Sequence, residues 1–313
     1  MRFQKPQALQ KGDTIGIVAL SRWIEPSRLK TASDLIEAHG YKVKIHPNNG
    51  LRLHEWAGNE KERARAFEDY WCDPEIKCII AAAGGTRTLH MLDNINFEKI
   101  EGHQKLLCGF SDITALHNAL LTQAHCIGLH GPDAGRFTKP NAKTFFESFE
   151  AIATGLEDAL EAYVWDDANI LHYGEGTGTL IGGNLCIFSY LLGTQYAPDF
   201  KGALLILEEA GEEIRNIDRM LLQLGRLGKL EELSGIIIGD FTEVQNTGAI
   251  SYPYSVEDLM HEHTDGLGIP VIINAPFGHG TRLQTLPLGC KARLKAGKSH
   301  VQFQLLEPAV NLS

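Results

Sequence analysis

Three side chains of the types that cooperate in nucleophilic catalysis each follow an apolar stretch of the chain: Ser111, Glu208 and His279. A serine hydrolase needs a base beside its serine and a carboxylate that orients the base. In α/β proteins such groups collect where strands end. The three residues together therefore offer the chemistry of a serine hydrolase. Taken singly, Glu208 also suits a helix cap, and His279 a loop histidine bonded to the backbone.

Ser111 stands where an apolar strand gives way to a helix. Residues 106–108 are apolar, Gly109 permits a turn, and from Ile113 onward apolar residues recur at helical spacing. Such a turn holds a hydroxyl beside the free N–H groups of a helix start, which can stabilise an oxyanion. The nucleophile-elbow pattern is half met, with glycine two residues before the serine but isoleucine two residues after it. Ser111 and Asp112 are also ordinary helix caps, so both interpretations stay open here.

The elements that must position Ser111 form an alternating pattern. Apolar runs with the composition of buried parallel strands are separated by helical patterns; the runs are 14–20, 41–45, 76–83, 106–108 and 126–130. This alternation predicts an α/β fold whose N-terminal domain, residues 1–160, is a doubly wound, mostly parallel sheet with helices on both faces.

A second domain is expected to carry Glu208 and His279. The polar stretch 155–178 predicts an irregular crossing, and the smaller C-terminal domain, α/β or β-rich, is expected to span residues 176–313. Its strands are predicted at 179–185, 202–207, 235–240, 270–275 and 301–305. Because the three candidate side chains are divided between the domains, we expect the active site at the interface between them.

Composition excludes several classes of function. The 313 residues are 43% hydrophobic and 22% charged, as in an ordinary globular protein. A net charge of -10 argues against nucleic acid as a partner. No apolar run is long enough to span a membrane, and no secretion signal is visible. The six cysteines form no Cys-x-x-Cys pair, which favours a reduced, cytoplasmic protein.

Two smaller features, a pair of histidines and a glycine turn, are candidate sites for a ligand. His261 and His263 lie two residues apart on a predicted helix, so they do not share a face and no metal site is expected. The turn Gly84-Gly85 follows a predicted strand. There it could bind a phosphate, donate an N–H to an oxyanion, or simply connect the strand to the next helix.

The stretch Gly109-Phe110-Ser111-Asp112-Ile113-Thr114-Ala115-Leu116 resembles the nucleophile motif of the LD-carboxypeptidases, a serine peptidase family that includes the microcin C immunity peptidases. The resemblance continues in the family's order over most of the chain, at residues 130–132, 182–185, 207–209, 217–221 and 277–279.

The resemblance implies roles for the three candidate residues. Ser111 would be the nucleophile, His279 the general base and acid, and Glu208 the residue that orients the histidine. Glu209 follows where the family often has aspartate, which leaves open which carboxylate faces the histidine. We choose Glu208 from its place in the motif.

The resemblance also implies the remaining parts of the site. The oxyanion donors would be the backbone N–H groups of Asp112 and Gly85, no cofactor or metal would be needed, and the protein would be a homodimer. Asn184, in a glycine turn after a predicted strand, is a candidate for contact with the substrate. A carboxypeptidase must recognise a free carboxylate, and Arg87 is a candidate partner because arginine binds carboxylates in a forked geometry.

The activity expected from the resemblance is release of the terminal D-alanine from cytosolic murein tetrapeptides, in peptidoglycan recycling. The alternative is an immunity-type peptidase that hydrolyses aminoacyl-sulfamoyl adenylates, for which Trp23, Trp56 or Trp165 would supply a platform for adenine. A non-catalytic protein that binds a small ligand through its glycine turns is the third interpretation.

Overall fold

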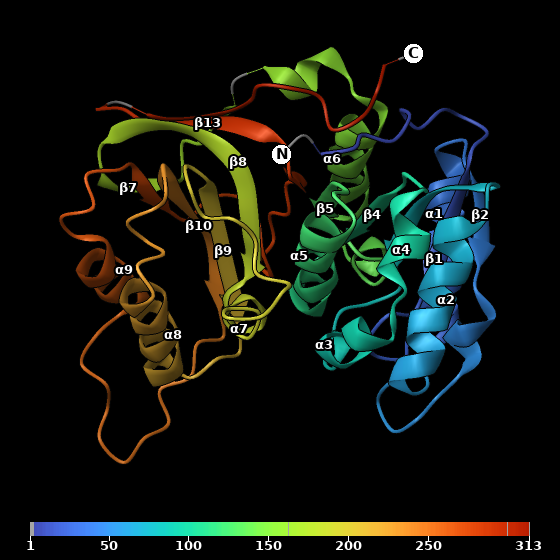
Figure 1. Ribbon diagram of the computed structural model, residues 1–313, viewed down its shortest axis with the longest axis horizontal. Coiled ribbons are helices and arrows are strands. Elements are labelled where there is room, and N and C mark those ends of the chain that lie inside the picture. Colours follow the sequence, from blue (N-terminus) through green and yellow to red (C-terminus); the bar gives the residue numbers. More distant parts are fainter. Residues whose placement is uncertain (1–2, 162, 299, 313) are drawn as a thin grey trace.

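The computed structural model describes residues 3–161, 163–298 and 300–312. Two β-sheets lie side by side, each with helices packed against it (Figure 1). We call the six-stranded sheet with its helices the N-terminal half, and the eight-stranded sheet with its helices the C-terminal half. The α/β class and the mostly parallel first sheet predicted from the sequence are confirmed.

The sheet of the N-terminal half has the strand order β12-β5-β4-β3-β1-β2. Its neighbours are parallel except for β12, which is antiparallel to β5. Each of the five predicted apolar runs supplies one strand, and β12 comes from the far end of the chain. The bounds are β1 Thr14–Val18, β2 Lys42–Ile45, β3 Ile76–Ala81, β4 Leu106–Gly109, β5 Gly128–His130 and β12 Leu286–Leu288.

Helices cover both faces of this sheet because its side chains alternate between two apolar clusters. On β1, Ile15 packs in the same cluster as Phe149 of α6, whereas Val18 packs with Phe67 of α2 and Leu116 of α5. The helices are α1 Pro26–Ala38, α2 Glu60–Cys72, α3 Thr88–Met91, α4 Phe97–Glu101, α5 Thr114–Gln123 and α6 Ala142–Thr154. Short 3-10 turns lie between them, at η1 Pro47–Gly50, η2 Leu92–Asn94, η3 Ser111–Ile113, η4 Arg136–Thr138 and η5 Glu157–Leu160.

The C-terminal half is built on a mixed sheet with the order β6-β14-β13-β8-β9-β10-β11-β7. The four strands β8 to β11 are parallel, and the strands outside them pair in antiparallel fashion. The bounds are β6 Tyr163–Val164, β7 Asn169–His172, β8 Gly174–Asn184, β9 Leu204–Ala210, β10 Gly235–Thr242, β11 Val271–Ile273, β13 Lys291–Ala296 and β14 Val301–Leu305.

Three helices accompany this sheet: α7 Leu185–Ser189, α8 Ile214–Arg226 and α9 Val256–Thr264. The buried side of α8 is apolar and includes Ile217, Leu221 and Leu224. None of the helices in the described part of the chain has both the length and the apolar character needed to cross a membrane.

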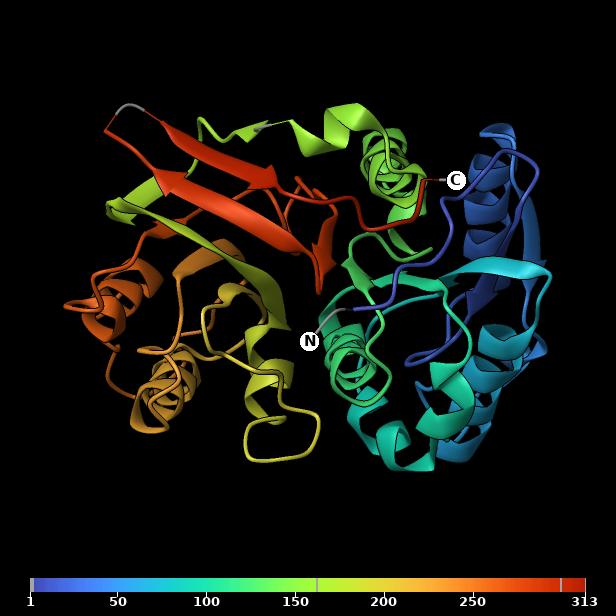
Figure 2. The same cartoon turned by 45° about the horizontal axis from the view of Figure 1, so that its top comes forward.

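Two segments depart from the division predicted from the sequence. Residues 155–178, expected to be an irregular crossing, contain the edge strands β6 and β7 and the start of β8. After β11 the chain returns to the first sheet as β12 before it re-enters the second as β13. Segments near the two ends of the chain also lie side by side, since Gln7 pairs with Asn311 (Figure 2). The halves are therefore joined by several passages of the chain.

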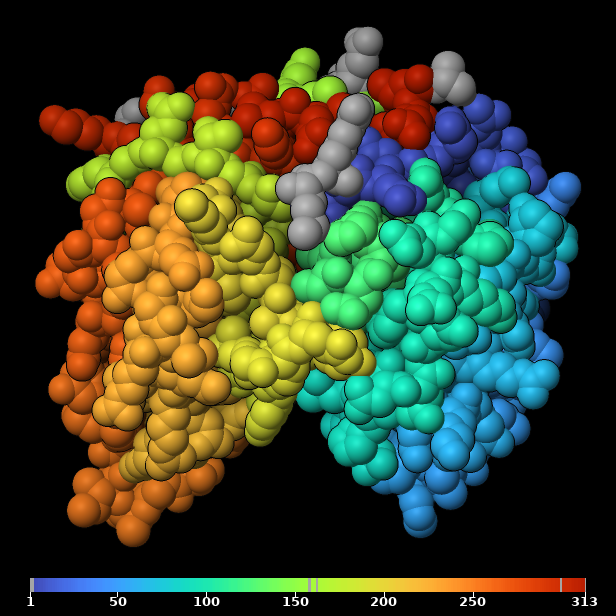
Figure 3. Space-filling view, in the orientation of Figure 1, coloured from blue at the N-terminus to red at the C-terminus, as the bar shows by residue number. Residues whose placement is uncertain are grey.

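Contact between the halves is close at the start of α5. A Cβ atom on Gly183 of β8 would lie only 2.5 Å from Oγ1 of Thr114, and the N–H of Asn184 donates to the same oxygen at 2.9 Å. Asn118 Nδ2 donates to the carbonyl of Gly182 at 3.0 Å. Glycine is required at position 183 because the backbone of β8 lies directly against the helix that follows Ser111. The space-filling view shows the halves in contact, with a notch between them at the lower edge (Figure 3).

Candidate active site

Ser111 occupies a sharp turn between β4 and α5. The strand ends at Gly109, Phe110 is extended, and Ser111 has a φ of 60°, in the left-handed region that residues with a side chain rarely adopt. Holding a residue there costs on the order of 1–3 kcal/mol, and such strain is concentrated at functional sites. The predicted strand-to-helix turn at Ser111 is confirmed, although Ile113 stands where an elbow commonly has its second glycine.

A buried carboxylate holds this turn in place. Oδ2 of Asp112 accepts hydrogen bonds from Ser21 Oγ at 2.5 Å and from both the N–H and Oγ1 of Thr88, at 2.9 and 2.6 Å. Asp112 is 1% exposed. Gly84 packs against the other side, where an added Cβ would lie 3.0 Å from Cβ of Ser111. The side chain of Asp112 therefore positions the turn, and only its N–H is free to face a substrate.

Glu208 and His279 form a hydrogen-bonded pair across two elements. Glu208 lies within β9 and is fully buried, while His279 lies in the loop between β11 and β12. Nδ1 of His279 is 2.6 Å from Oε2 of Glu208. Burial lowers the pKa of His279, but the charge and hydrogen bond of Glu208 outweigh it, so the net pKa is raised. The pair has the geometry of an oriented general base.

Glu209 faces the opposite side of β9 from this pair. Its carboxylate accepts from Asn184 Nδ2 at 2.9 Å and from the N–H groups of Cys186 at 2.7 Å and Ala210 at 2.9 Å. Burial raises its pKa. Neighbouring residues of a strand point to opposite faces, so only one of the two carboxylates can meet the histidine. Of the two, Glu208 is the one bonded to His279.

Two backbone N–H groups beside Ser111 have no acceptor among the described residues: those of Asp112 and Gly85. The N–H of Gly84 is different, because it donates to Oδ2 of Asp133 at 2.9 Å. Gly85 has a φ of 142°, and an added Cβ would lie 2.9 Å from both Cβ of Arg22 and Oγ of Ser21. Both N–H groups that the resemblance implies as oxyanion donors are therefore without another partner among the described residues.

A cavity of about 470 Å³ joins these groups. It is lined from the N-terminal half by residues after β1, β3, β4 and β5, and from the C-terminal half by residues at the end of β9 and β10 and after β11. The lining residues are Arg22, Arg28, Gly84, Gly85, Phe110, Ser111, Asp133, Gly135, Arg136, Lys139, Ala210, Thr242, Glu243 and His279. Its size is that of a site for a small molecule or short peptide.

The charge of this lining is mainly positive. Arg22, Arg28, Arg136 and Lys139 face two carboxylates, of which Asp133 is buried and already bonded to backbone N–H groups. A negative net charge of the whole chain thus coexists with a cationic cavity. The lining suits a substrate that carries a carboxylate or another anion.

Models of a known family match both halves of the chain. The LD-carboxypeptidase N-terminal domain matches residues 15–131, and the LD-carboxypeptidase C-terminal domain matches residues 177–294. A probable murein peptide carboxypeptidase of Bacillus subtilis is 31% identical over 94% of this chain and 92% of its own length. The chain belongs to the LD-carboxypeptidase family.

Two further relatives show the breadth of this family. The microcin C7 self-immunity protein MccF of Escherichia coli is 27% identical to the chain, and the match covers 94% of each protein. The crystal structure of a muramoyltetrapeptide carboxypeptidase from Oxalobacter formigenes superposes with a TM-score of 0.84 at 28% identity, over 94% of this chain and 99% of that one. The two-domain LD-carboxypeptidase fold is therefore shown for this chain.

The structure separates two predicted substrate contacts of this chain from the cavity. Arg87 is not among the lining residues; its guanidinium lies 4.8 Å from the ring centroid of Trp56 and 3.9 Å from Oε2 of Glu60. Asn184 is 5% exposed, and it caps α7 through its side-chain oxygen while its amide group donates to Glu209. Both residues therefore have structural contacts in place of an open face toward a substrate.

The tryptophans considered as platforms for adenine also lie outside the lining. Trp165 is buried and stacks on Phe303 at 4.7 Å between ring centroids. Trp23 packs under Arg52, and Trp56 donates to Thr86 Oγ1 at 2.9 Å. The aromatic rings among the described residues of the cavity wall are those of Phe110 and His279.

The sequence patterns do not single out the cations and the aspartate of the cavity wall: Arg22, Arg28, Asp133, Arg136 and Lys139. A usable signal was present, because they follow the first and fifth strands of a parallel sheet, whose C-terminal ends collect ligand-binding groups. What the sequence could not supply is the direction in which each side chain points.

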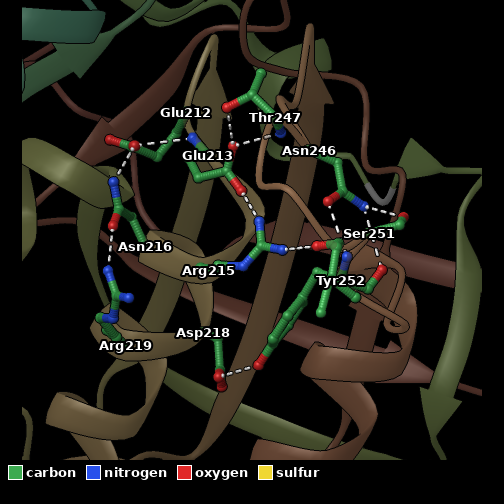
Figure 4. Close-up of polar contacts among 11 residues, drawn as sticks. Glu212, Glu213, Arg215, Asn216, Asp218, Arg219, Asn246, Thr247, Ser251 and Tyr252 are labelled. Atoms are coloured by element: carbon green, nitrogen blue, oxygen red, sulfur yellow. Dashed lines mark hydrogen bonds and ion pairs between the residues drawn. The ribbon is translucent and has the colours of Figure 1, made fainter.

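One wall of the cavity continues into the loop between β10 and α9, which begins at Glu243. Figure 4 shows how α8 holds this loop. Arg215 bonds Glu213 at 2.5 Å and the backbone of the loop, and the hydroxyl of Tyr252 donates to Oδ2 of Asp218 at 2.5 Å. Asp218 thus serves to anchor this loop, which fixes the wall that carries Glu243.

Proposed function

We propose that this protein is a serine carboxypeptidase that releases the terminal D-alanine from murein tetrapeptides. Ser111 is the nucleophile, His279 the general base and acid, and Glu208 the residue that orients the histidine. The observation that carries the proposal is the 2.6 Å contact between His279 and Glu208, beside a cavity that Ser111 and His279 both line.

The hydrogen bonding of His279 assigns its two ring nitrogens. Nδ1–H donates to the Glu208 carboxylate, which leaves the lone pair of Nε2 for the proton of Ser111 Oγ. Oγ then attacks the carbonyl carbon that precedes D-alanine. As the C–N bond breaks, the imidazolium returns its proton to the departing amine, and water hydrolyses the remaining ester by the same route.

The negative oxygen that forms during attack needs donors fixed in advance. The N–H groups of Asp112 and Gly85 supply them in our proposal, since both flank Ser111 and neither is bonded within the described chain. Removing one such donor in other serine hydrolases costs about 2.7–4 kcal/mol of transition-state stabilisation.

A carboxypeptidase must also bind the free carboxylate of its substrate. We assign this role to the cationic wall, Arg22, Arg28 and Lys139, in place of Arg87. Arg22 is the best candidate for binding the carboxylate, because it is exposed and its guanidinium has no acceptor among the described residues. Arg28, by contrast, is bonded to Gly135 and Thr138.

A peptide is favoured over a nucleotide as the substrate. The cavity offers cations for a carboxylate, but no tryptophan among its described lining residues on which adenine would stack. The names of the Bacillus subtilis and Oxalobacter formigenes relatives agree with a murein peptide. The kinship with MccF keeps an aminoacyl-sulfamoyl adenylate as the second candidate.

The test is mass spectrometry of a murein tetrapeptide incubated with the protein, beside Ser111→Ala. We expect the native protein to remove one D-alanine and the variant to be slower by roughly 10³-fold or more. An intact tetrapeptide together with cleavage of an aminoacyl-sulfamoyl adenylate would replace our substrate by the second candidate. Cleavage by Ser111→Ala at the native rate would refute the assigned nucleophile.

A further inference from the structure

The segment that follows β5 contacts both the nucleophile side and the base side of the cavity. Asp133, at 6% exposure, accepts from the N–H of Gly84 through Oδ2 and from the N–H of Arg136 through Oδ1, each at 2.9 Å. One buried side chain thereby fixes the glycine turn beside Ser111 and the start of η4. Arg136 leaves this anchor and extends toward the other half of the molecule.

The guanidinium of Arg136 bonds the backbone that carries the histidine. Nη2 donates to the carbonyl of His279 at 2.8 Å, and Nη1 lies 3.3 Å from the carbonyl of Gly280. Its central carbon lies 5.0 Å from the ring centroid of Phe110, which is 4.7 Å from the imidazole of His279. Arg136 thus touches the residue before the nucleophile and the residue proposed as the base.

The loop that carries His279 needs such support. Asp240 of β10 holds the other side of this loop. The N–H of Asp240 donates to the carbonyl of Phe277 at 2.8 Å, and Oδ2 of Asp240 accepts from the N–H of Gly280 at 3.1 Å. Gly278, between Phe277 and His279, has a φ of 120°. Because glycine has no side chain to restrict its backbone, this position does little by itself to fix the loop. The bond to Glu208 orients the imidazole ring but does not fix the backbone beneath it.

We propose that Arg136 is a positioning residue, which holds the His279 backbone from the N-terminal half so that the imidazole stays in register with Ser111. The inference rests on the proposed function in assigning the base to His279. It differs from a role in substrate binding, because the guanidinium of Arg136 bonds the backbone that carries His279 through two of its nitrogens. An error of about 1 Å in such a placement can lower a rate by on the order of 10²-fold.

Arg28 provides a matched control. It lines the same cavity with the same charge, but its guanidinium bonds Gly135 and Thr138 of its own half and not the His279 loop. If cavity charge alone matters, Arg28→Met and Arg136→Met will have the same effect. If position matters, Arg136→Met lowers kcat about 10- to 100-fold, while Arg28→Met acts mainly by raising KM.

Arg136→Lys separates charge from geometry. It keeps a cation near the histidine but cannot bond both carbonyls in a fork. We expect it to keep the pH profile of the native protein while kcat falls part of the way. A Lys variant with native kcat, or an Arg136→Met variant that changes KM alone, would overturn the inference.

The pH profile gives a readout that a purely structural role would not move. The charged or titratable groups that act on His279 are Glu208 and Glu209 of β9, His130 of β5 and Arg136. Arg136 lowers the pKa of His279, and the base acts when neutral. Arg136→Met is therefore expected to shift the acid limb of kcat/KM to higher pH, and Arg28→Met to shift it less.

A second measurement does not depend on the peptide. A fluorophosphonate forms an O–P bond with Ser111 Oγ and loses fluoride, while the serine proton passes to His279. We expect Arg136→Met to be labelled about tenfold or more slowly than the native protein, and much more slowly than Arg28→Met. Equal labelling rates would refute the positioning role, even if murein peptides were not the substrate. Labelling of Ser111 without peptide cleavage would instead reject the substrate alone.

Discussion

The residues that we propose as nucleophile and base, Ser111 and His279, are held in place by different parts of the molecule. Ser111 lies in a strand–turn–helix unit of one half, beside a buried Asp112 that makes three hydrogen bonds within that half. His279 lies in a loop that passes from a strand of one sheet to a strand of the other, and its contacts come from both halves. The position of Ser111 is part of the local fold, whereas that of His279 depends on assembly of the two halves.

This difference predicts that substitutions on the base side affect catalysis more than stability. In Glu208→Gln the amide keeps the size of the side chain but cannot stabilise the imidazolium. We expect kcat to fall by about 10³- to 10⁴-fold, as for the loss of charge in comparable triads. Urea unfolding should change by less than about 1 kcal/mol, because the variant removes a buried charge whose Oε1 has no partner among the described residues.

The neighbouring residue supplies the control for this prediction. Glu209→Gln changes an equally buried carboxylate on the opposite face of β9, where it accepts hydrogen bonds at the start of α7. Its effect is expected mainly on stability, with a much smaller loss of kcat. A larger loss of kcat for Glu209→Gln than for Glu208→Gln would mean that the two carboxylates have been assigned in the wrong order.

On the nucleophile side the order of effects is reversed. Asp112→Ala leaves the buried N–H of Thr88 without an acceptor, and the hydroxyls of Ser21 and Thr88 keep only the backbone carbonyls of Thr86 and Leu20. An unsatisfied buried group costs about 1–3 kcal/mol and each lost hydrogen bond to a charged group about 1.5–3 kcal/mol, so we expect the free energy of unfolding to fall by about 3 kcal/mol or more. Activity falls with it because the Ser111 turn loses its anchor.

Asp112→Asn tests whether this loss comes from the missing acceptor. The amide oxygen can replace Oδ2, and the amide nitrogen can take the place of Oδ1, which has no hydrogen-bond partner among the described residues. We expect urea unfolding to place this variant between the native protein and Asp112→Ala. If Asp112→Ala were as stable as the native protein, the contrast between the two sides of the cavity would not hold.

The sequence predicts one side of this contrast better than the other. The strand, turn and helix around Ser111 follow from local periodicity, and Glu208 follows from its place after an apolar run. By contrast, β12 is a three-residue strand after a loop, too short to give a pattern of its own. The edge strands β6 and β7 are partly exposed and only two and four residues long, too short to show an alternating pattern, so they resemble a linker.

The direction of side chains is the other property that the sequence left open. The glycine turn that holds Asn184 suits a ligand from its sequence, yet Gly183 of this turn is needed for close packing against Thr114 of α5. Arg87 was chosen because it follows Gly85 in the chain. In the structure Arg87 has a φ of 75° and its side chain packs on Trp56, while Arg22, far away in sequence, packs beside Gly85. Such pairings arise only when the strand ends are brought together.

The smallest expected effect tests that last distinction. Arg22→Met removes a cavity cation and is expected to raise KM for the tetrapeptide about tenfold, the size of one charge-assisted hydrogen bond. Arg87→Met breaks an exposed ion pair of 3.9 Å with Glu60 and should leave KM within about twofold, since such pairs contribute little. The measurement is steady-state kinetics with the tetrapeptide and with its C-terminal amide.

The amide makes the comparison specific for the carboxylate. If Arg22 binds that group, the native protein loses affinity when the carboxylate is replaced, and Arg22→Met loses much less, because the two changes remove the same interaction. Arg87→Met should lose as much as the native protein does. Arg87→Met could instead raise KM as much as Arg22→Met does, with no such increase for the amide. That result would assign carboxylate binding to Arg87, whose side chain would then have to leave Trp56 when substrate binds.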